Sequence, residues 1–125
     1  MTSSRAALRG QRCRPCDAAT PPLSATQARR LHAQIPLWGL AGNRLRRGLV
    51  FADFVAAMAF VRRMAALAER EGHHPDFTVH YRQVDVELWT HAVGGLSQND
   101  FVLAAKIEAL LSKGKRKRRR PDSNR

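Results

Sequence analysis

The chain has 125 residues, a formal net charge of +12 and an apolar fraction of 44%. This length is enough for one domain with a modest core. No segment approaches the roughly 20 consecutive apolar residues of a membrane span, which excludes an integral membrane protein. Two cysteines are too few for a disulfide scaffold.

The positive charge is concentrated at the two ends of the chain. Residues 1–20 carry four arginines against Asp17, and residues 112–125 carry eight basic residues against Asp122, so the ends hold +10 of the +12. We therefore predict a disordered basic extension over 1–20, a folded domain over 21–111 and a disordered polybasic tail over 112–125. Residues 113–120 would contact polyanions weakly and in a salt-dependent way. A nuclear-import signal or a nucleic-acid-binding arm is the alternative for this tail.

The first 20 residues are rich in Ala, Ser and Arg and lack the apolar core of a secretory signal. The missing apolar core argues against export, so we expect a cytoplasmic protein. The Ala, Ser and Arg content resembles an organelle transit peptide, which is the alternative. Cys13 and Cys16 form a CxxC motif, but no second cysteine pair completes a zinc site. We interpret their spacing as chance.

The first helix and the first hairpin are predicted by local signals. Ser24 and Gln27 form a capping box for a helix that stops at Pro36. Two short apolar stretches between Leu37 and Phe51 flank residues 41–43, which indicates a hairpin.

The longest helical pattern runs from Phe54 to Glu71, with Asp53 as its N-cap and Gly72 as the glycine that ends it. Its apolar residues recur at helical spacing and predict a wide buried stripe. The stripe comprises Phe54, Met58, Phe60, Val61, Met64, Ala65, Leu67 and Ala68.

After Pro75 apolar and polar residues alternate up to Trp89, which predicts a second hairpin with its turn near Arg82-Gln83. Ser97 then caps a last helix over residues 100–111. The order helix, two strands, helix, two strands, helix predicts a two-layer α+β fold, with a four-stranded antiparallel sheet and the helices on one face.

Four of the five histidines lie between residues 73 and 91. Pro75 forces His74 into an extended conformation, so the imidazoles of His73 and His74 should point in different directions. Together with His91 and with Glu69, one helical turn before His73, they could supply a proton donor, an acceptor and an orienting charge. A zinc site on the three histidines is an alternative, although it has no evident fourth ligand.

The spaced residues between positions 69 and 100 resemble the signature of the pterin-4a-carbinolamine dehydratases. The matching residues are Glu69, His73, His74, Pro75, Tyr81, His91 and Asp100. Further matches are Trp38-Gly39-Leu40, Phe51-x-Asp53-Phe54 and the run from Thr90 to Ser97. The resemblance covers residues 24–111, and the seven fixed residues at the correct gaps make it specific.

The resemblance implies a dehydratase that converts 4a-hydroxytetrahydrobiopterin to quinonoid dihydropterin and water, in tetrahydrobiopterin biosynthesis and recycling. It implies His73, His74, His91 and Glu69 as catalytic residues. His73 would be the acid, oriented by Glu69, and His74 and His91 would be pterin contacts or the base. Pro75, Tyr81 and Asp100 would bind substrate or support the site.

The same resemblance implies no metal or other cofactor, and assembly into a homodimer or homotetramer. Two other functions stay open. One is a non-catalytic protein-binding module, for which the resemblance implies stabilisation of a transcription-factor dimer, and the other is nucleic-acid binding through the basic tail.

Overall fold

The structure is a computed structural model that describes residues 8–14 and 21–118, with side chains described as far as Leu111. Its main elements follow the predicted order of helix, two strands, helix, two strands and helix. They are α2 (Ala25–His32), β1 (Gly39–Ala41), β2 (Arg44–Val50), α3 (Phe54–Glu71), β3 (Asp76–His80), β4 (Gln83–Leu88) and α4 (Gln98–Arg118), with a 3₁₀ turn, η1, at His91–Val93.

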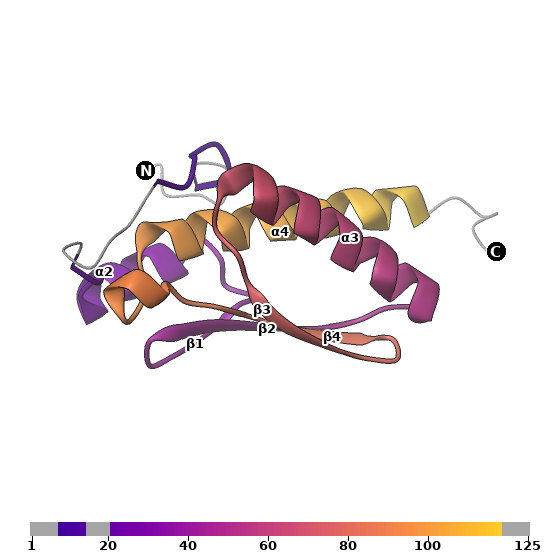
Figure 1. The fold of residues 1–125 in the computed structure, drawn as a ribbon, viewed down its shortest axis with the longest axis horizontal. Coiled ribbons are helices and arrows are strands. Elements are labelled where there is room, and N and C mark those ends of the chain that lie inside the picture. The colour runs from indigo at the N-terminus through magenta and orange to yellow at the C-terminus, as the bar shows by residue number, and fades with distance from the viewer. Residues whose placement is uncertain (1–7, 15–20, 119–125) are drawn as a thin grey trace.

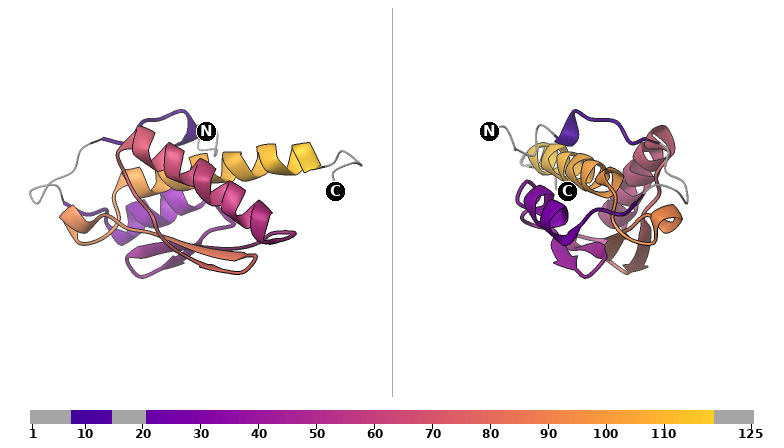
Figure 2. Two further views of the ribbon diagram at one scale, coloured as in Figure 1. Left: turned by 45° about the vertical axis from the view of Figure 1, so that its right-hand side comes forward. Right: turned by 90° about the vertical axis from the view of Figure 1, so that its left-hand side faces the viewer.

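The four strands form one antiparallel sheet in the order β1-β2-β4-β3. Figure 1 shows α3 and α4 lying across one face of this sheet, and the end-on view of Figure 2 separates the helical layer from the sheet layer. The predicted two-layer α+β fold is therefore confirmed. Within the described part of the chain, no helix is long and apolar enough to cross a membrane.

The second hairpin is built as predicted except at its turn. Val84, Val86 and Leu88 are buried against the helices, as their alternation requires. The pairing of His80 with Gln83 leaves Tyr81 and Arg82 as the two-residue turn, with Tyr81 at a φ of 58°. The prediction that Tyr81 lies in the strand is therefore wrong, because the strand ends one residue earlier.

Helix α3 has the predicted ends. The Asp53 carboxylate accepts a hydrogen bond from the Ala56 N–H at 2.8 Å, and Gly72 takes the left-handed conformation with a φ of 68°. Its buried face runs from Ala57 to Glu71, whereas Phe54 remains 48% exposed. The predicted stripe therefore includes two residues that do not face the core, Phe54 at the first turn and Ala65, which is also exposed.

The other two helices differ from the prediction mainly in their length. The capping box of α2 is complete, since the Ser24 hydroxyl accepts from the Gln27 N–H and the Gln27 amide accepts from the Ser24 N–H. Helix α4 continues to Arg118, seven residues beyond the expected end. Lysine and arginine are good helix formers, which favours continuation of the backbone into the basic segment.

Residues 8–14 pack against the helical layer, which contradicts the expected disorder for this part of the N-terminal extension. Leu8 is 1% exposed and belongs to the core, and Cys13 packs beside it. The Cys13 N–H donates to the Glu71 carboxylate at 2.9 Å, and the Arg14 N–H donates to the Asn99 side-chain oxygen at 2.7 Å. The predictions for residues 1–7, for the CxxC partner Cys16 and for the tail beyond residue 118 lie outside the described residues.

Candidate active site

The centre of the candidate site is a pair formed by His73 and Asp100. Gly72 turns the chain at the end of α3 and directs His73 towards the first turn of α4. There the Nε2 atom of His73 lies 2.6 Å from Oδ1 of Asp100. The His73 side chain is 11% exposed and that of Asp100 is fully buried. A hydrogen bond between ionisable groups in such a dry position holds the imidazole in one orientation.

Asp100 joins three segments of the chain. Its Oδ2 accepts the Thr90 hydroxyl at 2.8 Å and the Ser97 N–H at 2.9 Å. The hydroxyls of Thr90 and Ser97 are themselves 2.8 Å apart. The expected cap by Ser97 is therefore present only in part, because its N–H bonds to Asp100 whereas its hydroxyl is directed to Thr90. The spacing of Ser97 and Asp100 indicated this contact, but no local pattern could indicate the role of Thr90.

The second pair joins His74 to Glu69. The Nε2 atom of His74 lies 2.7 Å from Oε2 of Glu69, and the two side chains are 60% and 78% exposed. The sequence interpretation assigned Glu69 to His73, whereas the structure pairs Glu69 with His74. The adjacent imidazoles do diverge, as Pro75 was expected to require. Water screens this pair, so it holds His74 less firmly than Asp100 holds His73.

His91 is connected to the site by the residue that precedes it, Thr90. Thr90, which binds Asp100, immediately precedes His91, and the Thr90 N–H is fixed by the Gly95 carbonyl at 2.8 Å. The imidazole of His91 is exposed and packs on the Trp89 ring, with the ring centroids 3.9 Å apart. The backbone of His91 therefore adjoins the Asp100 network through Thr90, while its imidazole contacts Trp89.

The remaining predicted site residues lie on either side of this network. Pro75 is half-buried between His74 and the start of β3. Tyr81 is 67% exposed in the turn at the opposite end of β3. Tyr81 is therefore not brought to the histidines within this chain.

The buried carboxylate of Glu71, two residues before His73, is fixed by an ion pair and a hydrogen bond. The Glu71 side chain is 3% exposed and lies 3.4 Å from the Lys106 ammonium. Burial by itself would raise the pKa of Glu71, but the Cys13 N–H and Lys106 outweigh it and leave the pKa below the ordinary 4.5. Burial, followed by the charge of Glu71, raises the pKa of the Cys13 thiol to about 12. This thiol is therefore a poor nucleophile.

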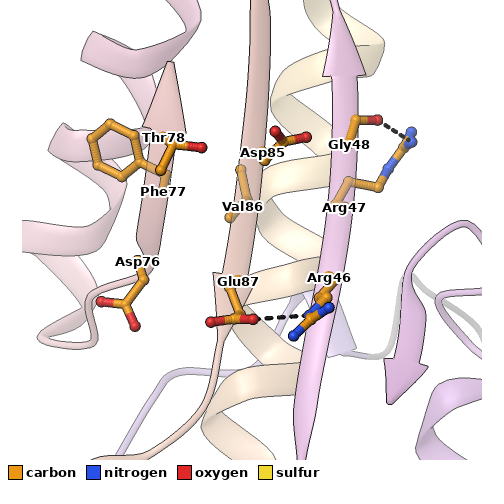
Figure 3. A pocket seen from close by; sticks show the side chains of 9 residues that line it. All are labelled: Arg46, Arg47, Gly48, Asp76, Phe77, Thr78, Asp85, Val86 and Glu87. Atoms are coloured by element: carbon orange, nitrogen blue, oxygen red, sulfur yellow. Dashed lines mark hydrogen bonds and ion pairs between the residues drawn. The ribbon is translucent and has the colours of Figure 1, made fainter. Parts of the chain in front are cut away.

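A separate hollow of about 450 Å³ lies on the sheet and is drawn in Figure 3. Its lining carries both charge signs, including the pair of Arg46 and Glu87 at 2.8 Å, and contains no histidine. General acid–base chemistry needs groups that exchange protons near neutral pH, so the histidine pairs define the candidate site better than this hollow.

The zinc alternative is not supported by this arrangement. His73 and His74 lead to different carboxylates, and His91 packs on an indole. Within residues 8–14 and 21–111, no three His, Cys, Asp or Glu side chains are grouped so that they could hold a metal ion. What the site offers is a buried imidazole–carboxylate pair, together with the exposed imidazoles of His74, the next residue in the chain, and His91, which follows Thr90.

The fold and the candidate site are those of a small α+β protein in which two adjacent histidines pair with different carboxylates. The comparisons then assign it to a family: the chain belongs to the pterin 4 alpha carbinolamine dehydratases, whose sequence profile matches residues 21–110. The predicted resemblance is confirmed.

Individual relatives support this assignment over most of their length. A protein of Nitrosospira multiformis named "Putative pterin-4-alpha-carbinolamine dehydratase" is 45% identical over 103 residues, which are 82% of this chain and 91% of the relative. A protein of the same name from Dechloromonas aromatica is 45% identical over 104 residues, covering 83% and 93%. A crystal structure described as a transcriptional coactivator/pterin dehydratase from Brucella melitensis superimposes with a TM-score of 0.68 at 28% identity, covering 71% of this chain and 97% of the other.

Proposed function

We propose that this protein is a hydro-lyase that converts 4a-hydroxytetrahydrobiopterin to quinonoid dihydropterin and water by histidine acid–base catalysis. In a cell this reaction would return the spent pterin for reuse. The observation that carries the proposal is the buried pair of His73 and Asp100. Membership of the dehydratase family supports the substrate class.

The pair fixes which nitrogen of His73 can react. An ionised carboxylate accepts hydrogen bonds and does not donate them, so Nε2 of His73 carries the hydrogen shared with Asp100. Nδ1 is then the atom that exchanges a proton with substrate. Asp100 stabilises the imidazolium form, as a buried carboxylate does when it orients a catalytic histidine.

The reaction needs one proton delivered and one removed. His73 donates a proton from Nδ1 to the 4a-hydroxyl, the C4a–O bond breaks and water leaves. A base takes the N5 proton, so the substrate loses one water and no electrons. His74 and His91 are the candidates for this base, because an accessible neutral imidazole accepts protons near neutral pH. Glu69 would orient His74 rather than His73.

The native assembly is proposed to be a homodimer or homotetramer. Apolar side chains remain on the surface of α3 at its first turn, where Phe54 is 48% and Val55 is 74% exposed. A second copy of the chain would cover such residues. Tyr81 would then belong to a pterin site only through a neighbouring copy, since it lies away from the histidines of its own chain.

The test is stopped-flow absorbance of 4a-hydroxytetrahydropterin decay with the wild type, His73→Ala and His80→Ala. His80 is an exposed histidine on β3 and serves as the matched control. We expect the wild type to accelerate decay and His73→Ala to lose roughly 10²–10⁴-fold of that rate. His80→Ala should keep it. A folded wild type that does not accelerate decay would refute the proposal and favour the non-catalytic binding module.

A further inference from the structure

The Trp89 ring is in contact with the His91 ring. The centroids of the indole and imidazole rings are 3.9 Å apart, with 34° between the ring planes. Among the described residues, the ion pairs of the site histidines join His73 and His74 to carboxylates. His91 has an aromatic face in place of a carboxylate.

The indole is itself fixed by two strands. Its N–H donates to the Asp76 carboxylate on β3 at 3.1 Å. The guanidinium carbon of Arg44 on β2 lies 4.2 Å from the centre of the Trp89 ring. Arg44 is in turn held by Glu87 at 2.9 Å. Trp89 therefore has a hydrogen bond at its edge and a cation at its ring, and both partners belong to the sheet.

We propose that Trp89 is a positioning residue that holds the His91 imidazole in the orientation required for proton transfer. The inference rests on the proposed function, in which His91 is a candidate base. An exposed histidine at the start of a 3₁₀ turn would otherwise sample several rotamers. Stacking on an anchored indole restricts them to the rotamers that keep the two rings in contact.

The stack can be observed without any substrate, because imidazolium in contact with an excited indole quenches its fluorescence. The chain has two tryptophans, so Trp38→Phe leaves Trp89 as the single reporter. Trp38 is buried in the core, and its indole N–H has no hydrogen-bond partner among the described residues. This substitution therefore removes no hydrogen bond that those residues make.

The groups that face Trp89 are Asp76, Arg44 and His91. Of these side-chain types, only imidazole ordinarily changes its charge between pH 5 and 8. We expect the Trp89 emission to fall as the pH is lowered from 8 to 5. The fall should vanish in Trp38→Phe/His91→Gln and persist in Trp38→Phe/His74→Gln. A fall that persists without His91 would overturn the inference.

Activity gives the second measurement. Trp89→Leu should lower kcat roughly 10-fold or more while KM changes less, because small misplacements of a catalytic group cost rate rather than binding. Trp89→Phe keeps an aromatic face and should restore most of kcat. If Trp89→Leu does not fold, as judged by circular dichroism, Asp76→Ala releases the indole without removing it and should lower kcat in the same direction.

The outcomes separate this inference from the proposed function. A wild type without activity refutes the proposed function, while the fluorescence titration still decides whether Trp89 holds His91. An active wild type whose kcat is unchanged in folded Trp89→Leu overturns the positioning role. Loss of kcat in Trp89→Leu with rescue by Trp89→Phe, together with His91-dependent quenching, supports it.

Discussion

Asp100→Asn is the substitution that tests the site most directly, since it changes charge and hydrogen-bonding capacity but hardly any volume. The asparagine oxygen can still accept from Thr90 and Ser97, as Oδ2 of Asp100 does at 2.8 and 2.9 Å. The amide nitrogen then takes the position of Oδ1, which lies 2.6 Å from Nε2 of His73. Two donors would face each other, so His73 must carry its hydrogen on Nδ1 instead.

The effect on stability should be modest. Hydrogen bonds to a charged group contribute about 1.5–3 kcal/mol each and neutral ones about 0.5–1.5 kcal/mol. Removing a buried charge also relieves its desolvation cost, which offsets part of the loss. We therefore expect Asp100→Asn to lower the free energy of unfolding by about 1–2 kcal/mol, or to lower Tm by roughly 4–8 °C for each kcal/mol.

The effect on rate should be larger. With Nδ1 already protonated in the neutral tautomer and no carboxylate to stabilise the imidazolium, His73 is a poor acid at the 4a-hydroxyl. The expected loss is roughly 10²–10⁴-fold, which corresponds to about 3–5 kcal/mol of activation free energy. Stopped-flow decay of 4a-hydroxytetrahydropterin below the Tm of the variant measures it.

Glu108→Gln is the matched control for Asp100→Asn. Glu108 is also on α4, is largely buried and pairs with Arg47 at 2.7 Å. Its amide variant loses a comparable charge and comparable stability, but it should keep the rate within about threefold because it is not part of the Asp100 network. A folded Asp100→Asn with a wild-type rate, or an equal loss in Glu108→Gln, would refute the reasoning.

Three further predictions concern the N-terminal segment. Leu8→Ala should lower the free energy of unfolding by roughly 2–4 kcal/mol, as measured by urea denaturation. The control Val55→Ala should change it very little, because the Val55 side chain is 74% exposed. Glu71→Gln should destabilise at pH 7, and this loss should shrink as the pH falls below about 4.5, because a carboxylate with a depressed pKa stabilises the fold only while it is ionised. Equal loss at pH 7 and pH 3.5 would contradict that assignment. In a Cys16→Ser background, Cys13 should react with iodoacetamide at pH 8 roughly 10–100-fold more slowly than a free cysteine, because its pKa is about 12. A reaction rate equal to that of the denatured chain would show that the segment is not packed.

The parts of the fold that could be predicted are those fixed by local signals. Asp53 and Gly72 mark the ends of α3 in the sequence, because a side-chain cap and a left-handed glycine each act within one turn. The capping box at Ser24 and Gln27 is local for the same reason. The alternation that ends at Leu88 fixes which face of β4 is buried.

The parts that could not be predicted depend on where a turn directs the chain. Glu69 and His73 are spaced as neighbours on one helical face, but α3 ends at Glu71 and Gly72 rotates His73 towards Asp100. Helical spacing no longer applies beyond that glycine, so Glu69 meets His74 instead.

The packing of residues 8–14 could not be predicted either, for a different reason. It depends largely on backbone N–H groups, those of Cys13 and Arg14, that donate to side chains more than 50 residues away. Backbone donors are the same for nearly every residue type, so no composition or periodicity marks them. Leu8 stands by itself among arginines and small residues, and a single apolar residue does not form a periodic pattern.

The two adjacent histidines occupy environments that suit different halves of one reaction. His73 is 11% exposed and bonded to a fully buried carboxylate, where a low dielectric strengthens the interaction. His74 is 60% exposed beside a carboxylate that is 78% exposed, where water competes. A general acid benefits from a fixed orientation towards the leaving hydroxyl, whereas a base must release its proton to solvent before the next turnover. We therefore expect loss of His74 to slow the reaction less when an external buffer can accept the proton, and loss of His73 to be insensitive to buffer.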